Sequence, residues 1–374
     1  MIQLLEIGLL ALILFYMQQT IYKKLWNRHL TASLFFKEKA IFQGEEGEIC
    51  EIITNRKHLP LSMLKVRFQT DRHLLFDAEK GSRTTDKYYR NDVLHINGGE
   101  KLTRSIRFVG GKRGFYQIES MDLVGSDLFY TMEFVQTLPI QTSLYVYPKP
   151  FNSEEFRLEL KQLNGEILTK QHLLEDPFEY RGIREYQPYD ELKSINWKAT
   201  AKTGQLKVNQ KNYTALPSLR IFFDVEDRGV LKNEDCVEAT FRIAAGLASF
   251  FLSRGMQVSC YGNGLDIHTS KPLWMDEKTG IVQLEQLYQA LARIDMEKPT
   301  VDFVETFQDK LLTSKSNVFT CIIAFHQYPP FLELMNKCKN VGNGFIWFYP
   351  VWDSTNPAIS PDIENSVRFI HIRK

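Results

Sequence analysis

Residues 219–225 read LRIFFDV, and hydrophobic side chains stand at both odd and even positions of this stretch. Because neighbouring residues of a β-strand face opposite sides of the sheet, such a run is typical of a strand buried on both faces. Downstream, stretches with helical spacing alternate with further apolar runs. The predicted helices are 237–254, 280–294, 301–312 and 330–339, and the predicted strands are 257–261, 318–325, 345–349 and 367–372. This order predicts an α/β domain of Rossmann type with a mostly parallel sheet over residues 216–374.

The stretch before this domain has a different rhythm. Between Ser33 and Tyr147, short segments alternate polar and apolar residues, as expected for strands with one buried face. They include 48–52, 64–68, 102–108 and 143–147, and they predict an all-β sandwich over residues 33–148. The run GGKRG at 110–114 lacks the spacing of a phosphate-binding loop and lies between two strand patterns, so it predicts a hairpin turn.

Residues 1–28 have the pattern of a membrane anchor. Ile7 to Met17 is a continuous apolar run, and its flanks extend it to about 20 residues, close to the length that crosses a bilayer. Lys23, Lys24 and Arg28 follow it, whereas no basic side chain precedes it. The positive-inside rule therefore predicts a single-pass transmembrane helix in the cell membrane, with the bulk of the chain in the cytoplasm. The alternative is a helix that lies in the membrane interface, or a signal-like remnant.

Composition limits the class of protein. A length of 374 residues with 44% hydrophobic and 13% aromatic content predicts a multi-domain chain with real cores. The net charge of +1 argues against a nucleic-acid binder, which normally carries a basic excess. The five cysteines are scattered, odd in number and without a Cys-x-x-Cys pair, which predicts reduced structural thiols on the cytoplasmic side.

Residues 149–215 link the two predicted domains, and their densest part is GIREYQPYDELKSINWKATAKTGQLKVNQ at 182–210. Asp190 is a good helix N-cap, Leu192, Ile195 and Ala199 recur at helical spacing, and Gly204 is a C-terminal stop signal, which together predict a short helix. Six side chains outside that apolar stripe are predicted to form one polar cluster: Arg184, Tyr186, Asp190, Lys193, Trp197 and Lys202.

This segment resembles the signature of the bacterial family called domain of unknown function 58, roughly Arg-x-Tyr-x-x-Gly-Asp-x-x-Arg-x-Ile-Asp-Trp-x-x-Ser/Thr-Ala-Arg. The matching residues are Arg184, Tyr186, Asp190, Ile195, Trp197, Thr200 and Ala201. The departures are Tyr189 for the Gly, Lys193 and Lys202 for the two Arg, and Asn196 for the acidic residue. A Lys cannot reproduce the bidentate fork of an Arg. The resemblance continues more loosely through 112–116, 125–129 and 146–148, and downstream into a domain similar to a von Willebrand factor A fold.

The resemblance implies a site for Mg²⁺ at the carboxyl end of the sheet, where that fold often carries an Asp-x-Ser-x-Ser loop. Here the loop reads DVEDR at 224–228, so Asp224 is kept while Glu226 and Arg228 replace the two serines. A guanidinium beside the ligands opposes a cation, which predicts loss of the metal and no cofactor. A rearranged acidic site for Mg²⁺, built from Asp224, Glu226 and Asp227, is one alternative. A loop in which Arg228 neutralises its own carboxylates is the other.

The signature has two interpretations. In the first, it is a buried polar staple, in which Arg184 and Lys193 pair with Asp190 while Tyr186 and Trp197 pack. In the second, it is an exposed docking surface, because Trp, Tyr and Arg dominate interface hot spots. Lys198, Lys207 and Lys211 add positive charge that suits an acidic partner or the anionic inner leaflet.

The leading hypothesis is a membrane-anchored, non-catalytic interaction protein. What is known of the similar family points to MoxR-type AAA+ ATPases as partners, in the assembly or maturation of complexes. One alternative is a Mg²⁺-dependent ligand-binding module that uses Asp224 and Glu226. Another is a hydrolase of unknown substrate with carboxylates near Asp190, although the sequence contains none of the common catalytic motifs. No oligomeric state follows from the sequence.

Overall fold

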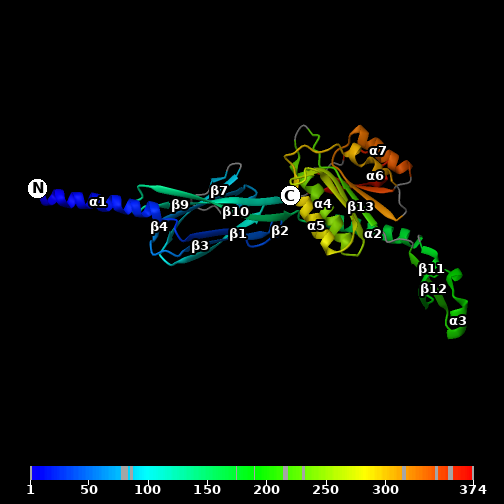
Figure 1. Ribbon diagram of the computed structural model, residues 1–374. Coiled ribbons are helices and arrows are strands. Elements are labelled where there is room, and N and C mark those ends of the chain that lie inside the picture. The colour runs from blue at the N-terminus through cyan, green and yellow to red at the C-terminus, as the bar shows by residue number, and fades with distance from the viewer. Residues whose placement is uncertain are drawn as a thin grey trace. The chain divides into compact units, whose positions relative to one another are not determined.

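The computed structural model describes residues 2–76, 83–84, 87–173, 175–188, 190–213, 218–229, 232–313, 317–341, 344–352 and 357–372. The chain divides into two compact units, Met1–Lys149 and Pro150–Lys374 (Figure 1). We call them unit 1 and unit 2.

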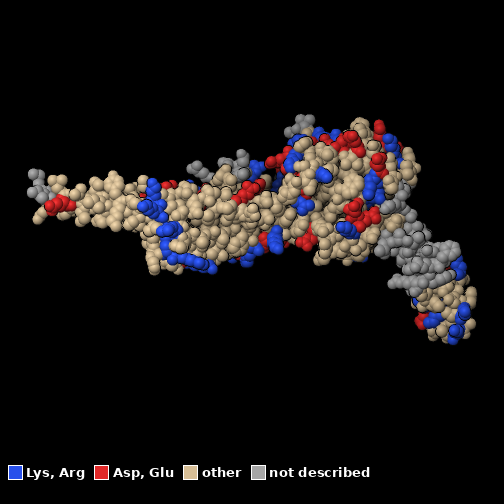
Figure 2. Space-filling model, in the orientation of Figure 1, with Lys and Arg blue, Asp and Glu red and all other residues tan. Residues whose placement is uncertain are grey.

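Unit 1 begins with the long apolar helix α1 (Ile2–Leu25). Its segment Leu5–Leu25 is long and apolar enough to cross a membrane, so the predicted N-terminal apolar helix is confirmed. Figure 2 shows its surface as mostly uncharged, in keeping with a sequence that has no charged residue between Glu6 and Lys23.

The last turns of α1 are held by unit 1. Tyr22 and Trp26 are 5% and 4% exposed, and the Tyr22 hydroxyl donates to the carbonyl of Pro60 at 3.2 Å. Gly125 lets the indole of Trp26 come close, because a Cβ there would lie 2.5 Å from a ring carbon. The helix therefore enters the hydrophobic core instead of ending in solvent.

The rest of unit 1 is built from two sheets. The four-stranded sheet has the order β1-β3-β8-β5, and the six-stranded sheet has the order β2-β10-β9-β4-β7-β6. Neighbouring strands are antiparallel except for β2 and β10. The bounds are β1 Leu30–Phe36, β2 Ala40–Phe42, β3 Glu46–Asn55, β4 Leu61–Asp71, β5 Leu74–Phe76, β6 Arg83–Thr84, β7 Lys87–Ile96, β8 Lys101–Gly110, β9 Gly114–Ser126 and β10 Glu133–Tyr147.

One hydrophobic core serves both sheets. Ile49 and Phe108 come from the four-stranded sheet, and Leu64, Leu123 and others come from the six-stranded sheet. Along β3, buried and half-buried residues alternate, as the polar and apolar alternation of its sequence predicts. Each fully buried side chain of this size contributes roughly 1.5–3 kcal/mol, so the shared core is the main source of cohesion in unit 1.

The predicted hairpin at 110–114 is wrong. Strand β8 pairs with β3 and β5, whereas β9 pairs with β10 and β4. The GGKRG stretch therefore carries the chain from one sheet to the other. Alternation of polar and apolar residues marks the two strands correctly but carries no information about which strand each one pairs with.

Unit 2 contains a mixed α/β region. Its sheet has the order β15-β14-β13-β17-β18-β19, with β16 paired to β14. Strands β13, β14, β17, β18 and β19 are parallel, while β15 and β16 run antiparallel. The bounds are β13 Ser218–Phe223, β14 Gln257–Asp266, β15 Pro272–Lys278, β16 Ile294–Asp295, β17 Val318–Ile323, β18 Phe345–Val351 and β19 Val367–His371. The sequence did not predict the antiparallel edge strand β15.

Helices cover both faces of this sheet (Figure 1). Consecutive residues Phe222 and Phe223 of β13 point to opposite faces. Phe222 meets Phe307 and Phe223 meets Phe241, with ring centroids 5.8 and 5.7 Å apart. The helices are α4 Glu234–Leu252, α5 Ile281–Ala292, α6 Phe303–Leu312 and α7 Pro329–Asn340, and α2 Glu154–Leu173 precedes them. The N-caps Asn233 of α4 and Asp302 of α6 accept backbone hydrogen bonds.

Candidate functional site

The signature segment forms the connection of a two-stranded ribbon in unit 2. Strands β11 (Glu175–Glu185) and β12 (Lys207–Tyr213) are antiparallel, and Arg184 lies opposite Val208. Between them lie the 3₁₀ turn η1 (Leu192–Ser194) and the short helix α3 (Trp197–Thr203). Ile195 forms a β-bridge with Val208, and these two side chains are 7% and 3% exposed. They supply the apolar centre of the connection.

Asp190 does not cap the helix as the sequence predicts. The N-cap of α3 is Asn196, whose side chain accepts a hydrogen bond from Ala199 N–H at 2.9 Å, and the helix ends at Gly204 with φ 72°. Asp190 instead receives two hydrogen bonds from the guanidinium of Arg184, at 2.6 and 2.5 Å. A fork of two charge-assisted hydrogen bonds outweighs the single bond that a cap forms, so the helix starts later than predicted.

The Arg184 fork also decides the charge of Asp190. Its hydrogen bonds hold the pKa of the Asp190 carboxyl below its ordinary value, helped by the N–H of Gln187 at 2.8 Å. Asp190 is therefore an ionised acceptor at neutral pH. A carboxylate in this state does not supply a proton as a general acid.

Of the other signature residues, Thr200 and Tyr186 form hydrogen bonds within the connection, whereas Lys193 and Trp197 do not take the places that the staple requires. The Thr200 hydroxyl accepts from Lys207 N–H at 3.0 Å, and the backbone of Tyr186 donates to Leu206 at 3.0 Å. Lys193 pairs with Glu191 at 2.7 Å instead of with Asp190, which corrects that part of the staple. The staple is wrong for Trp197 as well, because this residue is 67% exposed.

The structure thus joins Arg184 to Asp190 but does not gather all six predicted side chains into one cluster. Lys198 and Lys202 are exposed on α3 as well. Leu192, 71% exposed on η1, adds an apolar surface residue that the sequence argument assigned to the buried stripe. Tyr189 and the side chain of residue 211 lie outside the described residues.

A second candidate site lies at the carboxyl end of β13, where Asp224 is 3% exposed. Its Oδ1 accepts hydrogen bonds from the amide of Asn263 at 2.7 Å and from Glu226 N–H at 2.9 Å. The Tyr328 hydroxyl lies 3.4 Å from Oδ2. Burial raises the pKa of Asp224 to about 6, although the two hydrogen bonds oppose this shift. The sequence argument missed Asn263, whose only signal is an amide inside an apolar strand.

Arg228 faces the acidic loop. Its guanidinium contacts Glu226 at 2.5 Å and Asp302 at 3.6 Å, and lies 3.9 Å from the centre of the Tyr328 ring. The carboxylate of Asp227 does not face Arg228; its Oδ1 lies 3.0 Å from His326 Nε2. In the described ranges, no group of three or more His, Cys, Asp or Glu residues is arranged to hold a metal ion.

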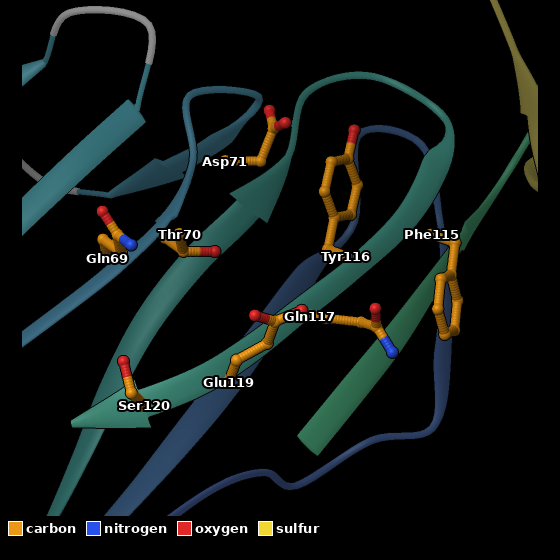
Figure 3. A pocket seen from close by; sticks show the side chains of 8 residues that line it. All are labelled: Gln69, Thr70, Asp71, Phe115, Tyr116, Gln117, Glu119 and Ser120. Carbon is orange, nitrogen blue, oxygen red and sulfur yellow. The ribbon is translucent and has the colours of Figure 1, made fainter. Parts of the chain in front are cut away.

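A polar pocket of about 220 Å³ lies in unit 1 (Figure 3). Strands β4 and β9 pair as far as Phe68 and Met121. Past that pair the pocket is lined by Gln69, Thr70, Asp71, Phe115, Tyr116, Gln117, Glu119 and Ser120. The hydroxyl of Thr70 is buried there and has no hydrogen-bond partner among the described residues. The sequence offered no signal for this pocket, because it depends on where the pairing of two strands ends.

No protein-family model and no curated protein matches the chain. Among solved structures, a CARDB domain from Pyrococcus furiosus is 14% identical, with a TM-score of 0.20 over 30% of this chain and 86% of that chain. The sporulation control protein Spo0M from Bacillus subtilis is 12% identical, with a TM-score of 0.19 over 42% of this chain and 58% of that one. A non-cellulosomal cohesin from Archaeoglobus fulgidus is 11% identical, with a TM-score of 0.20 over 34% and 97%. At these TM-scores the likenesses carry no argument about fold or function.

Proposed function

We propose that this protein is a membrane-anchored, non-catalytic adaptor that docks a partner through the exposed face of α3. The observation that carries the proposal is the exposure of Trp197, at 67%, on a connection held by the Arg184–Asp190 fork and the Ile195–Val208 bridge. A large aromatic residue on a preorganised frame is the usual centre of an interface hot spot.

The charge on α3 and η1 suggests the chemistry of the partner. Lys198 and Lys202 are exposed on the same short helix, and Lys193 on η1 is exposed as well, although it pairs with Glu191. An acidic patch that surrounds an apolar pocket would complement this face, and the charges would speed the encounter. Helix α1 is the proposed single-pass anchor, with the bulk of the chain in the cytoplasm, because Lys23 and Lys24 lie in its last turn.

We propose membership of the domain of unknown function 58 family, on the signature residues given above. On this proposal, the two sheets of unit 1 are a β-sandwich, and the α/β region of unit 2 is a von Willebrand factor A-like domain whose metal site has lost its serines. The partner class that follows from the resemblance is a MoxR-type AAA+ ATPase or its client. Catalysis has less support, because both carboxylate oxygens of Asp190 are already bonded to the guanidinium of Arg184.

Cross-linking of the full-length protein in native membranes, followed by mass spectrometry, tests the docking face. Trp197→Ala is one bait and Ile281→Ala is its matched control, since Ile281 is an apolar residue 81% exposed on another helix. The proposal expects an AAA+ ATPase with the wild type and with Ile281→Ala, and its loss with Trp197→Ala. Recovery of the ATPase with all three baits would contradict the proposed docking face. Recovery of no partner with any bait would contradict the adaptor role.

A further inference from the structure

Four exposed apolar side chains stand in one tight turn of unit 1, directly after β9. Leu128 is 47% exposed, Phe129 and Tyr130 are each 57% exposed, and Met132 is 43% exposed. Isolated exposed apolar residues are ordinary, but a cluster of them within one turn is not. The turn therefore has the composition of a contact surface.

The turn is closed by its own polar groups. The buried carboxylate of Asp127 accepts hydrogen bonds from Thr131 N–H at 2.6 Å and from Met132 N–H at 2.9 Å. The N–H of Tyr130, which adopts φ 59°, donates to the Asp127 carbonyl at 3.1 Å. These three N–H groups keep their partners when the turn leaves water, which lowers the cost of burying this backbone in a membrane.

The turn is tied to the side of helix α1. The Gln18 amide donates to Asp127 Oδ2 at 2.9 Å and accepts from Leu128 N–H at 3.3 Å. Three residues earlier in α1, the ring of Phe15 lies beside the ring of Phe129, with centroids 5.6 Å apart. The apolar patch of the turn is thus continuous with the apolar surface of the helix.

The apolar run of α1 overlaps the part of the helix that unit 1 holds. The candidate span Leu5–Leu25 includes Gln18, which is bonded to the turn, and Tyr22, which is buried in unit 1. Between the charged residue Glu6 and Gln18 lie the 11 residues 7–17, which rise about 16 Å at about 1.5 Å per residue, less than the hydrocarbon thickness of about 30 Å. A bilayer that takes in the whole apolar run therefore extends up to unit 1, and a bilayer that covers Phe15 also reaches Phe129.

We propose that Leu128, Phe129, Tyr130 and Met132 insert into the lipid bilayer beside α1 and form a second membrane contact that fixes unit 1 at the membrane surface. This inference rests on the membrane anchoring proposed above. Lys23 and Lys24 lie about 12 Å further along the helix than Phe15, at a depth suited to anionic headgroups.

Depth-dependent quenching in vesicles tests the contact. The full-length protein, in a Cys50→Ser background, carries a single fluorophore at Leu128→Cys and is reconstituted into phosphatidylethanolamine and phosphatidylglycerol vesicles. The other four cysteines are buried. Nitroxide on the lipid acyl chains quenches from within the bilayer, and iodide quenches from water. Leu10→Cys, 59% exposed on α1, reports the position of the anchor. Leu75→Cys, 54% exposed on β5, is the matched control. It follows the C-terminal end of β4, whereas the turn lies near the start of β4.

The proposal expects the nitroxide lipids to reduce fluorescence at Leu128 and Leu10 but not at Leu75, and iodide to quench only Leu75. Quenching of Leu10 by lipid and of Leu128 by iodide overturns the second contact while leaving the anchor intact. Quenching of both Leu10 and Leu128 by iodide alone overturns the anchor as well. Protection of Leu128 from both quenchers means that a second copy of the chain covers the turn, which also overturns the proposal. Phe129→Asp with the Leu128 label is expected to lose the lipid quenching.

Discussion

The guanidinium of Arg184 and the carboxylate of Asp190, six residues apart in sequence, are joined by two near-parallel hydrogen bonds of 2.6 and 2.5 Å. This fork ties the end of β11 to the loop that leads into η1. It therefore sets the direction in which α3, and with it Trp197, leaves the ribbon.

Arg184→Lys should loosen the 186–206 connection without unfolding unit 2. A lysine ammonium replaces two directed bonds by one point charge, so we expect faster amide hydrogen exchange in η1 and α3 and unchanged exchange in the α/β sheet. Arg157→Lys on α2 is the control, because the guanidinium of Arg157 lies 3.9 Å from the carboxylate of the exposed Glu154, a weak surface pair. Equal protection in Arg184→Lys and wild type would show that the fork does not order the connection.

Trp197→Ala and Ile195→Ala should have opposite effects. Trp197 is mostly exposed, so its removal should change the free energy of unfolding by less than about 1 kcal/mol and abolish partner capture. Ile195 is 7% exposed, and truncation there should cost about 2–4 kcal/mol of local stability. Chemical denaturation and hydrogen exchange measure both. A large stability loss in Trp197→Ala would restore the buried-staple interpretation.

The contribution of Asp224 to the stability of unit 2 should rise as the pH falls from 7 towards 4. Burial raises the folded-state pKa of Asp224 to about 6, above the unfolded value of about 3.9. The folded state therefore binds the proton more tightly, and this stabilisation, up to about 3 kcal/mol, is complete below the unfolded pKa and is lost as the pH rises through 6.

Asp224→Asn isolates this effect, because the amide is isosteric with the protonated carboxyl. The difference in free energy of unfolding between variant and wild type should favour the variant at pH 7 and vanish near pH 4. Taking this difference removes the contribution of Glu51 in unit 1, whose pKa burial raises to about 7. A difference that stays constant with pH would contradict the raised pKa of Asp224.

Millimolar Mg²⁺ should leave the melting temperature of the wild type unchanged. The guanidinium of Arg228 already neutralises Glu226 and lies over Tyr328, and a cation at Asp224 would be repelled by it. The double variant Glu226→Ser, Arg228→Ser restores the Asp-x-Ser-x-Ser pattern, and we expect Mg²⁺ to raise its melting temperature. Stabilisation of the wild type by Mg²⁺ that disappears in Asp224→Ala would instead establish the metal-dependent module.

Gly125→Ala should weaken the hold of unit 1 on α1. The new methyl group would lie 2.5 Å from a carbon of the Trp26 indole, and such overpacking typically costs 1–3 kcal/mol. Gly165→Ala on α2 is the matched control, since a Cβ there meets nothing within 4 Å, and the helix should gain up to about 1 kcal/mol. Thermal unfolding measures both. An unchanged melting temperature in Gly125→Ala would mean that the Trp26 indole moves aside without loss of stability.

The two kinds of strand were predictable from local pattern. Residues 219–223 of the first apolar run lie in β13, which is buried along its whole length, and the alternating segments at 48–52 and 102–108 lie in β3 and β8. The ribbon β11–β12 and the edge strand β15 were not predicted. The antiparallel pairing that holds them lies between segments that are not strongly apolar, so the hydrophobic pattern is weak there.

The apolar N-terminal helix, the alternating strands of unit 1 and the α/β order of unit 2 follow from local sequence pattern, because burial leaves a periodic trace along the chain. The partners of Asp190 and Asn196 depend on the folded chain: Asp190 binds Arg184 while Asn196 caps the helix, since both acceptors suit either role and the choice depends on which donor the fold brings near. The same holds for the turn at Leu128–Met132, which lies beside Phe15 through the pairing of distant segments. Such contacts across more than a hundred residues have no local signature.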